Sequence, residues 1–147
     1  MASKIWKALT PSFRTRLVRV TQPKFTVSVA AVVTNPEGKV LLLKHVLRPA
    51  ADWGIPGGFM EADEQPHDAI RRELLEETGL ELQEVNMLRV RTMARHIEIL
   101  FRARANGEGE VRSREITKLG WYDPEDMPKG TAGIQKHLIE EILRGEV

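Results

Sequence analysis

The pattern of apolar and polar positions predicts several strands arranged around one acidic helix. Residues from Phe25 to Val33 are rich in Val, Thr and Ala and predict a strand. Asn35-Pro36-Glu37-Gly38 predicts a turn, which returns the chain as a second strand from Lys39 to Val46. Strand patterns recur in three later segments, 84–91, 95–105 and 115–122.

Two helices are predicted within and after these strands. Pro66 suits the first position of a helix because its missing N–H needs no partner there, and Gly79 can adopt the left-handed conformation that ends one. Gln65 then stands at the N-cap, where Ser or Thr would cap more strongly. A last helix from about Ala132 to Leu143 is amphipathic, and its predicted apolar face holds Ile134, Leu138, Ile139 and Ile142. Strands on both sides of a helix, with a closing helix, predict an α/β layered domain with a mixed sheet.

The first 24 residues form a basic leader without a single carboxylate. Its Lys and Arg residues are Lys4, Lys7, Arg14, Arg16, Arg19 and Lys24. Apolar residues at roughly helical spacing, from Trp6 to Val18, predict a helix, although Pro11 interrupts the pattern. A transit peptide or a nucleic-acid-binding arm would show the same charge, but a basic helix with a tether is the favoured interpretation. We therefore expect a leader over residues 1–24 and one domain over residues 25–147.

Composition narrows the class of protein. A chain of 147 residues fits one domain, and 41% hydrophobic with 29% charged residues is typical of a soluble globular protein. The apolar runs are too short to span a membrane, and the net charge of +1 gives no general attraction to nucleic acid or anionic lipid. Because there is no cysteine, a metal could be held only by oxygen or imidazole. We expect a cytoplasmic protein with no membrane partner.

The acidic helix carries closely spaced like charges that need a counter-charge. Glu73 is three residues from Glu76 and four from Glu77, and such pairs destabilise a helix by roughly 0.2–0.5 kcal/mol each. The counter-charge could be a neighbouring side chain, and the candidates are Arg71, Arg72 and Lys44. It could equally be Mg²⁺ or Mn²⁺, which prefer carboxylate oxygens. Charge spacing alone leaves both possibilities open.

The residues around this helix resemble a known signature. From Gly58 the chain runs through five residues to Glu64, and then through seven more to Arg72-Glu73-Leu74-Leu75-Glu76-Glu77-Thr78-Gly79-Leu80. This resembles the box of the Nudix hydrolases at every specified position. The preceding Trp53-Gly54-Ile55-Pro56-Gly57-Gly58 is similar to the family's lead-in, and the resemblance extends over about residues 25–143. It implies a Nudix-type α/β/α sandwich with a mixed β-sheet.

The resemblance also implies a reaction and a set of roles. Nudix hydrolases cleave, with Mg²⁺ or Mn²⁺, a diphosphate bond in a nucleoside diphosphate linked to another moiety. The implied metal ligands are the carbonyl of Gly58 and the carboxylates of Glu73, Glu76 and Glu77. Glu64 and Arg72 would form a structural pair that orients the helix.

The base and the substrate contacts are less narrowly implied. Catalytic candidates are Glu73, Glu76 and Glu115, and the loop acids Glu108 and Glu110 are further candidates for the base. Residues that could contact substrate are Arg48, Trp53, Arg91 and His96, although packing or exposure explains each one equally well.

Three functions are compatible with these residues. The expected partner is a nucleotide-like small molecule. One alternative is an RNA 5′-end pyrophosphohydrolase, in which the basic leader would follow the phosphates. Another is a nucleotide-binding sensor without activity, which the complete set of box carboxylates disfavours. Oligomeric state is open, since the leader could cover its own domain or reach a neighbour in a dimer.

Overall fold

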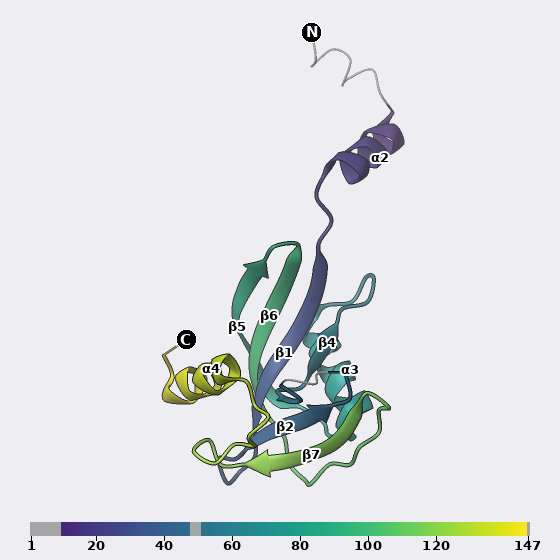
Figure 1. The fold of residues 1–147 in the computed structure, drawn as a ribbon. Helices are drawn as coiled ribbons and strands as arrows, with labels where there is room; N and C mark the ends of the chain where they lie inside the picture. Colours follow the sequence, from purple (N-terminus) through teal and green to yellow (C-terminus); the bar gives the residue numbers. More distant parts are fainter. Residues whose placement is uncertain (1–9, 48–50, 147) are drawn as a thin grey trace.

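A mixed β-sheet packed between two helices forms the centre of the molecule, and a third helix stands apart from it (Figure 1). The computed structural model describes residues 10–47 and 51–146. The strands are β1 (Thr26–Thr34), β2 (Val40–His45), β3 (Trp53–Gly54), β4 (Gly57–Phe59), β5 (Gln83–Met93), β6 (His96–Arg104) and β7 (Ile116–Tyr122). The helices are α2 (Pro11–Thr21), α3 (Pro66–Thr78) and α4 (Gly133–Arg144).

The strand order confirms the predicted mixed sheet. The main path is β3-β2-β1-β6-β5, while β4 pairs with β1 and β7 pairs with β2. Strand β1 runs parallel to β6 along its whole length, and its pairing with β2 and β4 is antiparallel. The predicted turn after β1 is closed by a hydrogen bond from the Asn35 N–H to the Lys39 carbonyl. The two strands then separate, and β2 pairs instead with β7.

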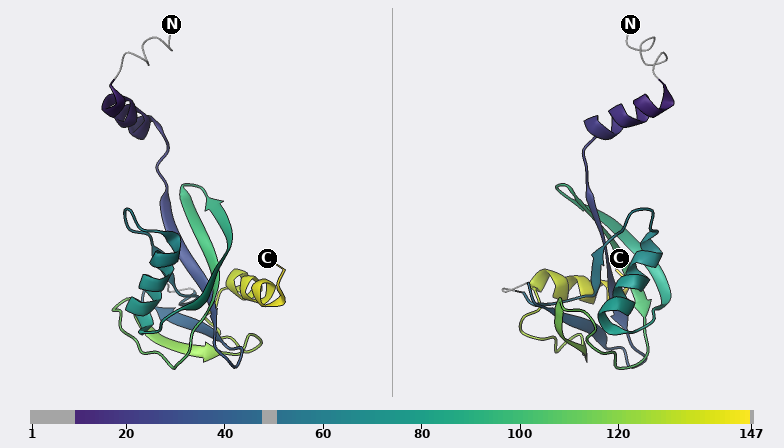
Figure 2. Two further views of the ribbon diagram at one scale, coloured as in Figure 1. Left: turned by 180° about the vertical axis from the view of Figure 1, so that it is seen from behind. Right: turned by 90° about the vertical axis from the view of Figure 1, so that its right-hand side faces the viewer.

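Alternate residues of β1 pack against different helices, which makes the domain an α/β/α sandwich. Val29, Ala31 and Val33 lie in a core cluster with Ile70 and Leu74 of α3. The intervening β1 residues Ala30 and Val32 lie in a second cluster with three residues of α4, namely Leu138, Ile139 and Ile142. Figure 2 shows the two helices on opposite sides of the sheet. The predicted layered architecture is therefore confirmed.

The apolar face predicted for α4 needs one correction. Leu138, Ile139 and Ile142 are buried, but Ile134 is 77% exposed. At about 100° per residue, Ile134 lies about 40° outside the arc of the other three. It also belongs to the first turn, so its inclusion in the buried face was wrong.

The predicted ends of α3 are confirmed. The helix begins at Pro66, and Gly79 adopts the left-handed conformation with φ 71°, donating its N–H to the Leu75 carbonyl. Gln65 makes no side-chain capping bond, as expected for a weak cap. Helix α3 is therefore stopped by its glycine and held by burial of one face.

Within the described residues, the leader helix α2 begins at Pro11, while Trp6 and Leu9 of the predicted pattern lie outside them. Thr10 precedes it and accepts a hydrogen bond from the Phe13 N–H through its side chain. Proline is favoured at a first helical position, where its lack of an N–H costs nothing. No residue of α2 is buried. Among the described helices, none has the length and apolar character needed to cross a membrane.

Candidate active site

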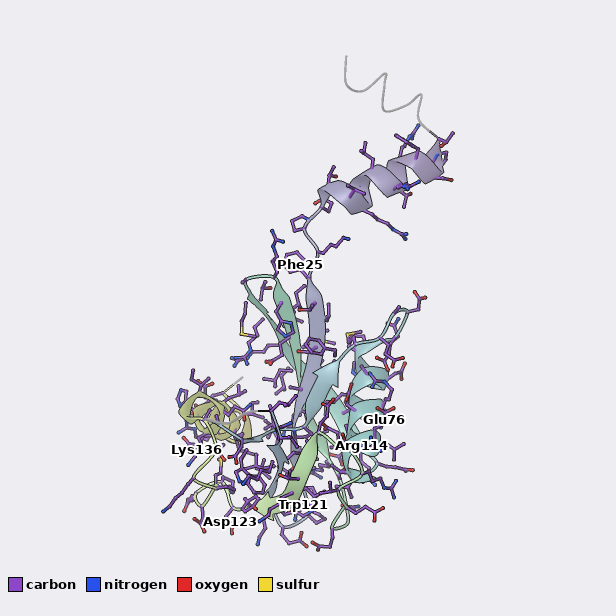
Figure 3. All side chains as sticks on the ribbon, turned by 45° about the vertical axis from the view of Figure 1, so that its right-hand side comes forward. Phe25, Glu76, Arg114, Trp121, Asp123 and Lys136 are labelled. Atoms are coloured by element: carbon purple, nitrogen blue, oxygen red, sulfur yellow. The ribbon has the colours of Figure 1, made fainter. Side chains whose placement is uncertain are left out.

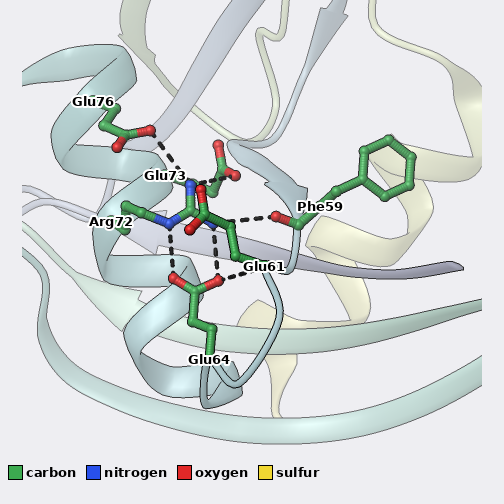
Figure 4. A network of polar contacts seen from close by, with 6 residues as sticks. All are labelled: Phe59, Glu61, Glu64, Arg72, Glu73 and Glu76. Carbon is green, nitrogen blue, oxygen red and sulfur yellow. Dashed lines mark hydrogen bonds and ion pairs between the residues drawn. The ribbon is translucent and has the colours of Figure 1, made fainter.

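The guanidinium of Arg72 gathers the acidic groups at the junction of α3 and β4 (Figure 4). Its Nε lies 2.7 Å from Oε1 of Glu64, and one Nη donates to Oε2 of the same carboxylate at 3.0 Å. The other Nη donates to Glu73 at 2.8 Å and approaches Glu76 at 3.4 Å. Arg72 also donates to the carbonyl of Phe59 at 3.1 Å. The predicted pair of Glu64 and Arg72 thus forms, and it ties the helix to the glycine loop.

The pKa values of the Glu64 and Glu73 carboxylates shift in opposite directions. Hydrogen bonds from Arg72 and from the Glu61 N–H lower the pKa of Glu64 to about 2. Burial raises the pKa of Glu73 in spite of its bond to Arg72. Hydrogen bonding to Glu64 raises the pKa of Arg72, so the arginine stays charged. The hydrogen bonds of Arg72 therefore favour the charged form of Glu64, whereas burial disfavours the charged form of Glu73 in spite of the same guanidinium.

Two glycines let the β4 strand approach its neighbours closely. A Cβ at Gly58 would overlap the carboxylate of Glu73, which is the flexible end of a side chain. A Cβ at Gly57 would instead overlap backbone atoms of Val29 and Ala30 on β1. Gly57 is therefore required by the sheet, whereas Gly58 is required by the position of the Glu73 carboxylate. Gly58 and the Glu73 carboxylate, which are two of the implied metal ligands, therefore lie close together.

A small acidic recess lies on the same loop. It has a volume of about 170 Å³, and Glu77 and Glu115 line it together with His45, Leu47, Gly57, Gly58 and Phe59. Glu77 is only 6% exposed. Glu115 comes from the segment before β7, and its carbonyl accepts the N–H of Val46. The structure thus brings the candidate Glu115 beside α3, although the two lie far apart in sequence.

The donor set fits a hard divalent cation. Within residues 10–47 and 51–146, no three His, Asp or Glu side chains are grouped as a metal site. Glu73 and Glu76 are engaged by Arg72, whereas Glu77 lines the acidic recess. All four implied ligands offer oxygen, from three carboxylates and the Gly58 peptide. Oxygen ligands of this kind suit Mg²⁺ or Mn²⁺.

A second recess, of about 210 Å³, lies on the other side of the glycine loop and reaches α4. Its polar residues are Ser28, Arg91, His96, Glu98 and Gln135, and its other lining residues are Val29, Ala30, Ile55, Gly57, Gly58, Phe59 and Leu138. Arg91 Nε lies 2.6 Å from Oε1 of Glu98. The His96 ring is held between the hydroxyls of Thr26 and Ser28, at 2.8 and 2.9 Å. We call this cavity the polar recess.

Two of the four predicted substrate residues meet in the polar recess. Arg91 and His96 line it together. Trp53 does not, because it packs edge to face against Tyr122 in the core cluster on the α4 side, with ring centroids 5.2 Å apart. In this position Trp53 anchors the segment before β4 to the core. Arg48 lies outside the described residues.

Sequence reasoning missed three polar residues of this recess, namely Ser28, Glu98 and Gln135. Glu98 is the cross-strand partner of Arg91 in the β5–β6 pair. Gln135 has a buried Oε1 that finds no hydrogen-bond partner within the described part of the chain. A signal for Gln135 was present, since it precedes Ile139 by four residues and Ile142 by seven and so falls on the apolar stripe of α4. A buried, unpaired amide oxygen that lines a cavity is a natural contact for a ligand.

Comparisons with known proteins identify the family. The model of the NUDIX domain family matches residues 24–142. The chain belongs to the Nudix family. A MutT-like protein from Streptomyces ambofaciens is 30% identical to this Nudix chain over 125 residues, which is 84% of the chain and 80% of the relative. The crystal structure of a MutT NUDIX hydrolase from Burkholderia pseudomallei superposes with a TM-score of 0.69 at 26% identity, covering 81% of this chain and 98% of that one.

Two further relatives differ in what they act on or bind. An RNA pyrophosphohydrolase from Pseudomonas fluorescens is 41% identical over 64 residues, but this covers 44% of the Nudix chain and only 39% of the relative. The NUDIX domain of Shewanella oneidensis NrtR, solved with ADP ribose, gives a TM-score of 0.72 at 20% identity and covers 100% of this chain and 99% of that one. That likeness shows the fold alone. As a class, the Nudix chain is a pyrophosphohydrolase, an enzyme that hydrolyses acid anhydrides.

Replacing Gly58 should separate activity from stability. We expect Gly58→Ala to lower kcat/KM by about 100-fold, because a displacement of about 1 Å in a catalytic group can cost that much. The midpoint of urea unfolding should change little, because the added methyl group displaces a side-chain end and no backbone. Gly133→Ala is a matched control, since a Cβ there meets nothing within 4 Å. Full activity in Gly58→Ala would show that Glu73 need not lie where the structure has it.

Acid unfolding should report on the bond between Arg72 and Glu64. The folded state lowers the pKa of Glu64 from its usual 4.5 to about 2, so it favours the ionised form. The resulting stabilisation is complete above pH 4.5 and is lost as the pH falls toward 2. The free energy of unfolding of Glu64→Gln should therefore lie below that of wild type at pH 6, and the gap should close toward pH 2. A gap of constant size over this range would contradict the ion pair.

Proposed function

We propose that the chain hydrolyses a diphosphate bond in a small nucleoside diphosphate linked to another moiety, and that Mg²⁺ or Mn²⁺ is required. One observation carries this proposal. Gly57, Gly58 and Phe59 line both the acidic recess and the polar recess. A substrate whose polar end group entered the polar recess would therefore present its diphosphate beside Gly58 and the carboxylates of α3.

The metal would be held by the carbonyl of Gly58 and the carboxylates of Glu73, Glu76 and Glu77. When bound, such an ion neutralises charge on phosphoryl oxygens and makes a bound water more acidic. The protein's own part is to hold the acidic groups together in its absence, which Arg72 does for Glu73 and Glu76. Because one face of α3 is buried, the helix is held in place, and this fixes the position of these side chains relative to the glycine loop.

The attacking water needs a carboxylate to accept its proton. Glu115 is suited to this because it lines the same recess as Glu77 and is not among the carboxylates that Arg72 engages. Glu73 is the second candidate, since burial raises its pKa and a higher pKa makes a carboxylate a stronger base. Glu76, with a side chain 61% exposed and in contact with Arg72, is better suited to binding metal than to accepting the proton.

The polar recess would bind the nucleoside side of the substrate. Its volume of about 210 Å³ is below the roughly 300–1,000 Å³ of sites that enclose a whole ligand, so it suits one ring system. The carboxamide of Gln135 offers a donor and an acceptor side by side, as base edges require. Ile55 and Leu138 supply apolar contact on the same wall.

A second candidate substrate is the 5′ end of RNA. The match to the RNA pyrophosphohydrolase of Pseudomonas fluorescens favours it, although this match covers less than half of either chain. A terminal nucleotide could enter the polar recess in the same way as a free one. A nucleotide-binding sensor without activity is the third possibility, and it is at odds with the complete acidic set on α3.

A substrate panel with one matched pair of variants tests the proposal. Wild type should release monophosphate from at least one nucleoside diphosphate derivative with Mg²⁺, and little without it. Glu76→Gln should lower kcat by about 100-fold or more, since losing one group that stabilises transition-state charge, here the metal that Glu76 would hold, costs about that much, while the fold stays intact because this side chain is 61% exposed. Asp68→Asn, in the first turn of the same helix, should keep wild-type rates.

The panel also separates the three candidate functions. It should include RNA with a 5′-triphosphate beside the small nucleotides. Preference for that RNA would replace the small-molecule proposal with the RNA one. Tight binding of a nucleotide without turnover of any panel member would point to a sensor. Wild-type rates in Glu76→Gln would refute the role of the α3 carboxylates.

A further inference from the structure

Helix α2 presents an apolar stripe that no other segment of residues 10–47 and 51–146 covers. Phe13, Leu17 and Val20 lie within about 60° of one another around the helix axis, and they are 53%, 41% and 75% exposed. Arg14 and Arg16 flank the stripe on its two sides. In Figure 3 the side chains of α2 project into open space, away from the sheet. A basic amphipathic helix of this kind gains stability only when its stripe is covered.

An apolar groove lies on the domain near the point where the leader joins it. Its volume is about 590 Å³, and it is lined by Phe25, Thr26, Val27, Phe59, Met60, Glu61, Ala62, Pro66 and Ile99. Phe25 and Phe59 are 43% and 63% exposed, which is high for large apolar side chains. We call this surface the Phe25–Phe59 groove.

The short tether directs α2 away from the groove of its own chain. Helix α2 ends at Thr21, and β1 begins at Thr26. The intervening Gln22 is extended, with φ −83° and ψ 146°, and Pro23 favours that conformation in the residue before it. Four residues reach about 13 Å at most, and both views of Figure 2 show α2 continuing outward beyond the end of β1. Folding back onto the groove would require a reversal within this segment.

The charges favour a second copy of the chain as the partner. Six of the 22 Lys and Arg residues and none of the 21 Asp and Glu residues precede Phe25, so the rest of the chain holds 16 basic and 21 acidic residues. Glu61 lines the groove, and Asp63 lies two residues further along the same loop and is exposed. A basic helix matches such a surface. An anionic lipid or an RNA would attract α2 but repel the acidic domain beside it.

We propose that α2 docks in the Phe25–Phe59 groove of a second copy, and that two copies exchange their helices to form a dimer. The stripe of α2 and the groove are both apolar, and Arg14 and Arg16 beside the stripe are opposite in charge to Glu61 and Asp63 at the groove. Exchange makes the contact twice in one dimer, as a two-fold interface does. The mode is that of an amphipathic helix laid in a groove.

Docking of α2 in the groove would also affect the candidate active site. Phe59 lines the groove, the polar recess and the acidic recess, and its carbonyl accepts a hydrogen bond from Arg72. A helix covering its exposed ring would hold the loop that carries Gly58. Loss of the dimer should therefore raise KM or lower kcat without altering any box residue.

A mass measurement with matched variants tests the exchange. Wild type should behave as a dimer in light scattering at micromolar concentration. Phe13→Gln with Leu17→Gln removes the stripe and should give a monomer, whereas Ser12→Gln with Thr15→Gln places the same residues elsewhere on the helix and should leave a dimer. None of these side chains is buried in the domain, so all variants should fold. A monomeric wild type, or equal masses for the two double variants, would refute the proposal.

Cross-linking then identifies which chain occupies the groove. The chain has no cysteine, so Leu17→Cys and Ala62→Cys can be introduced singly and the two proteins mixed. Oxidation should join one chain of each kind at twice the monomer mass. A cross-link that forms only within a chain carrying both cysteines would show self-docking and overturn the proposal. So would a monomer that binds phosphatidylglycerol vesicles or RNA through the α2 stripe.

Discussion

The hydrogen bonds of the Arg72 guanidinium are the interaction on which the candidate active site depends. Three carboxylates of the box lie within 3.4 Å of it, and the same group donates to the carbonyl of Phe59. Without a nearby cation, like charges three and four residues apart would weaken α3 and separate from one another. With it, the helix and the β4 strand are joined at one point. The position of Gly58, and hence of both recesses, follows from that connection.

This arrangement holds partly desolvated carboxylates close together at the candidate metal site. Ile70 and Leu74 anchor α3 in the core, so Glu73 and Glu77 cannot withdraw into solvent without moving the helix. Burial consequently raises the pKa of Glu73, even though Arg72 is bonded to it. Proteins tolerate such local cost at functional sites because the rest of the fold supplies the stability. A divalent ion would relieve it.

Local signals predicted some parts of the molecule and could not reach others. Pro66 and Gly79 predicted both ends of α3, because each residue's own backbone preference decides those ends. The side-by-side position of β1 and β6, and the attachment of β4 to β1, depend on contacts between distant segments that no local pattern encodes. Ile134 was placed in the core by its spacing, yet the first turn of α4 leaves it exposed. Gln135 is the opposite case, a polar residue that is buried. Only the structure reveals that its side-chain oxygen lacks a hydrogen-bond partner among the described residues.

Calorimetric titration of the full chain with Mg²⁺ and with Mn²⁺ measures whether the α3 carboxylates form a metal site, independently of any substrate. We expect saturable binding to wild type and at least about tenfold weaker binding to Glu73→Gln, a difference of about 1.4 kcal/mol. Asp68→Asn, which removes a carboxylate from the same helix outside the site, should bind as wild type does. Equal affinity in Glu73→Gln and wild type would contradict a metal site built on this helix.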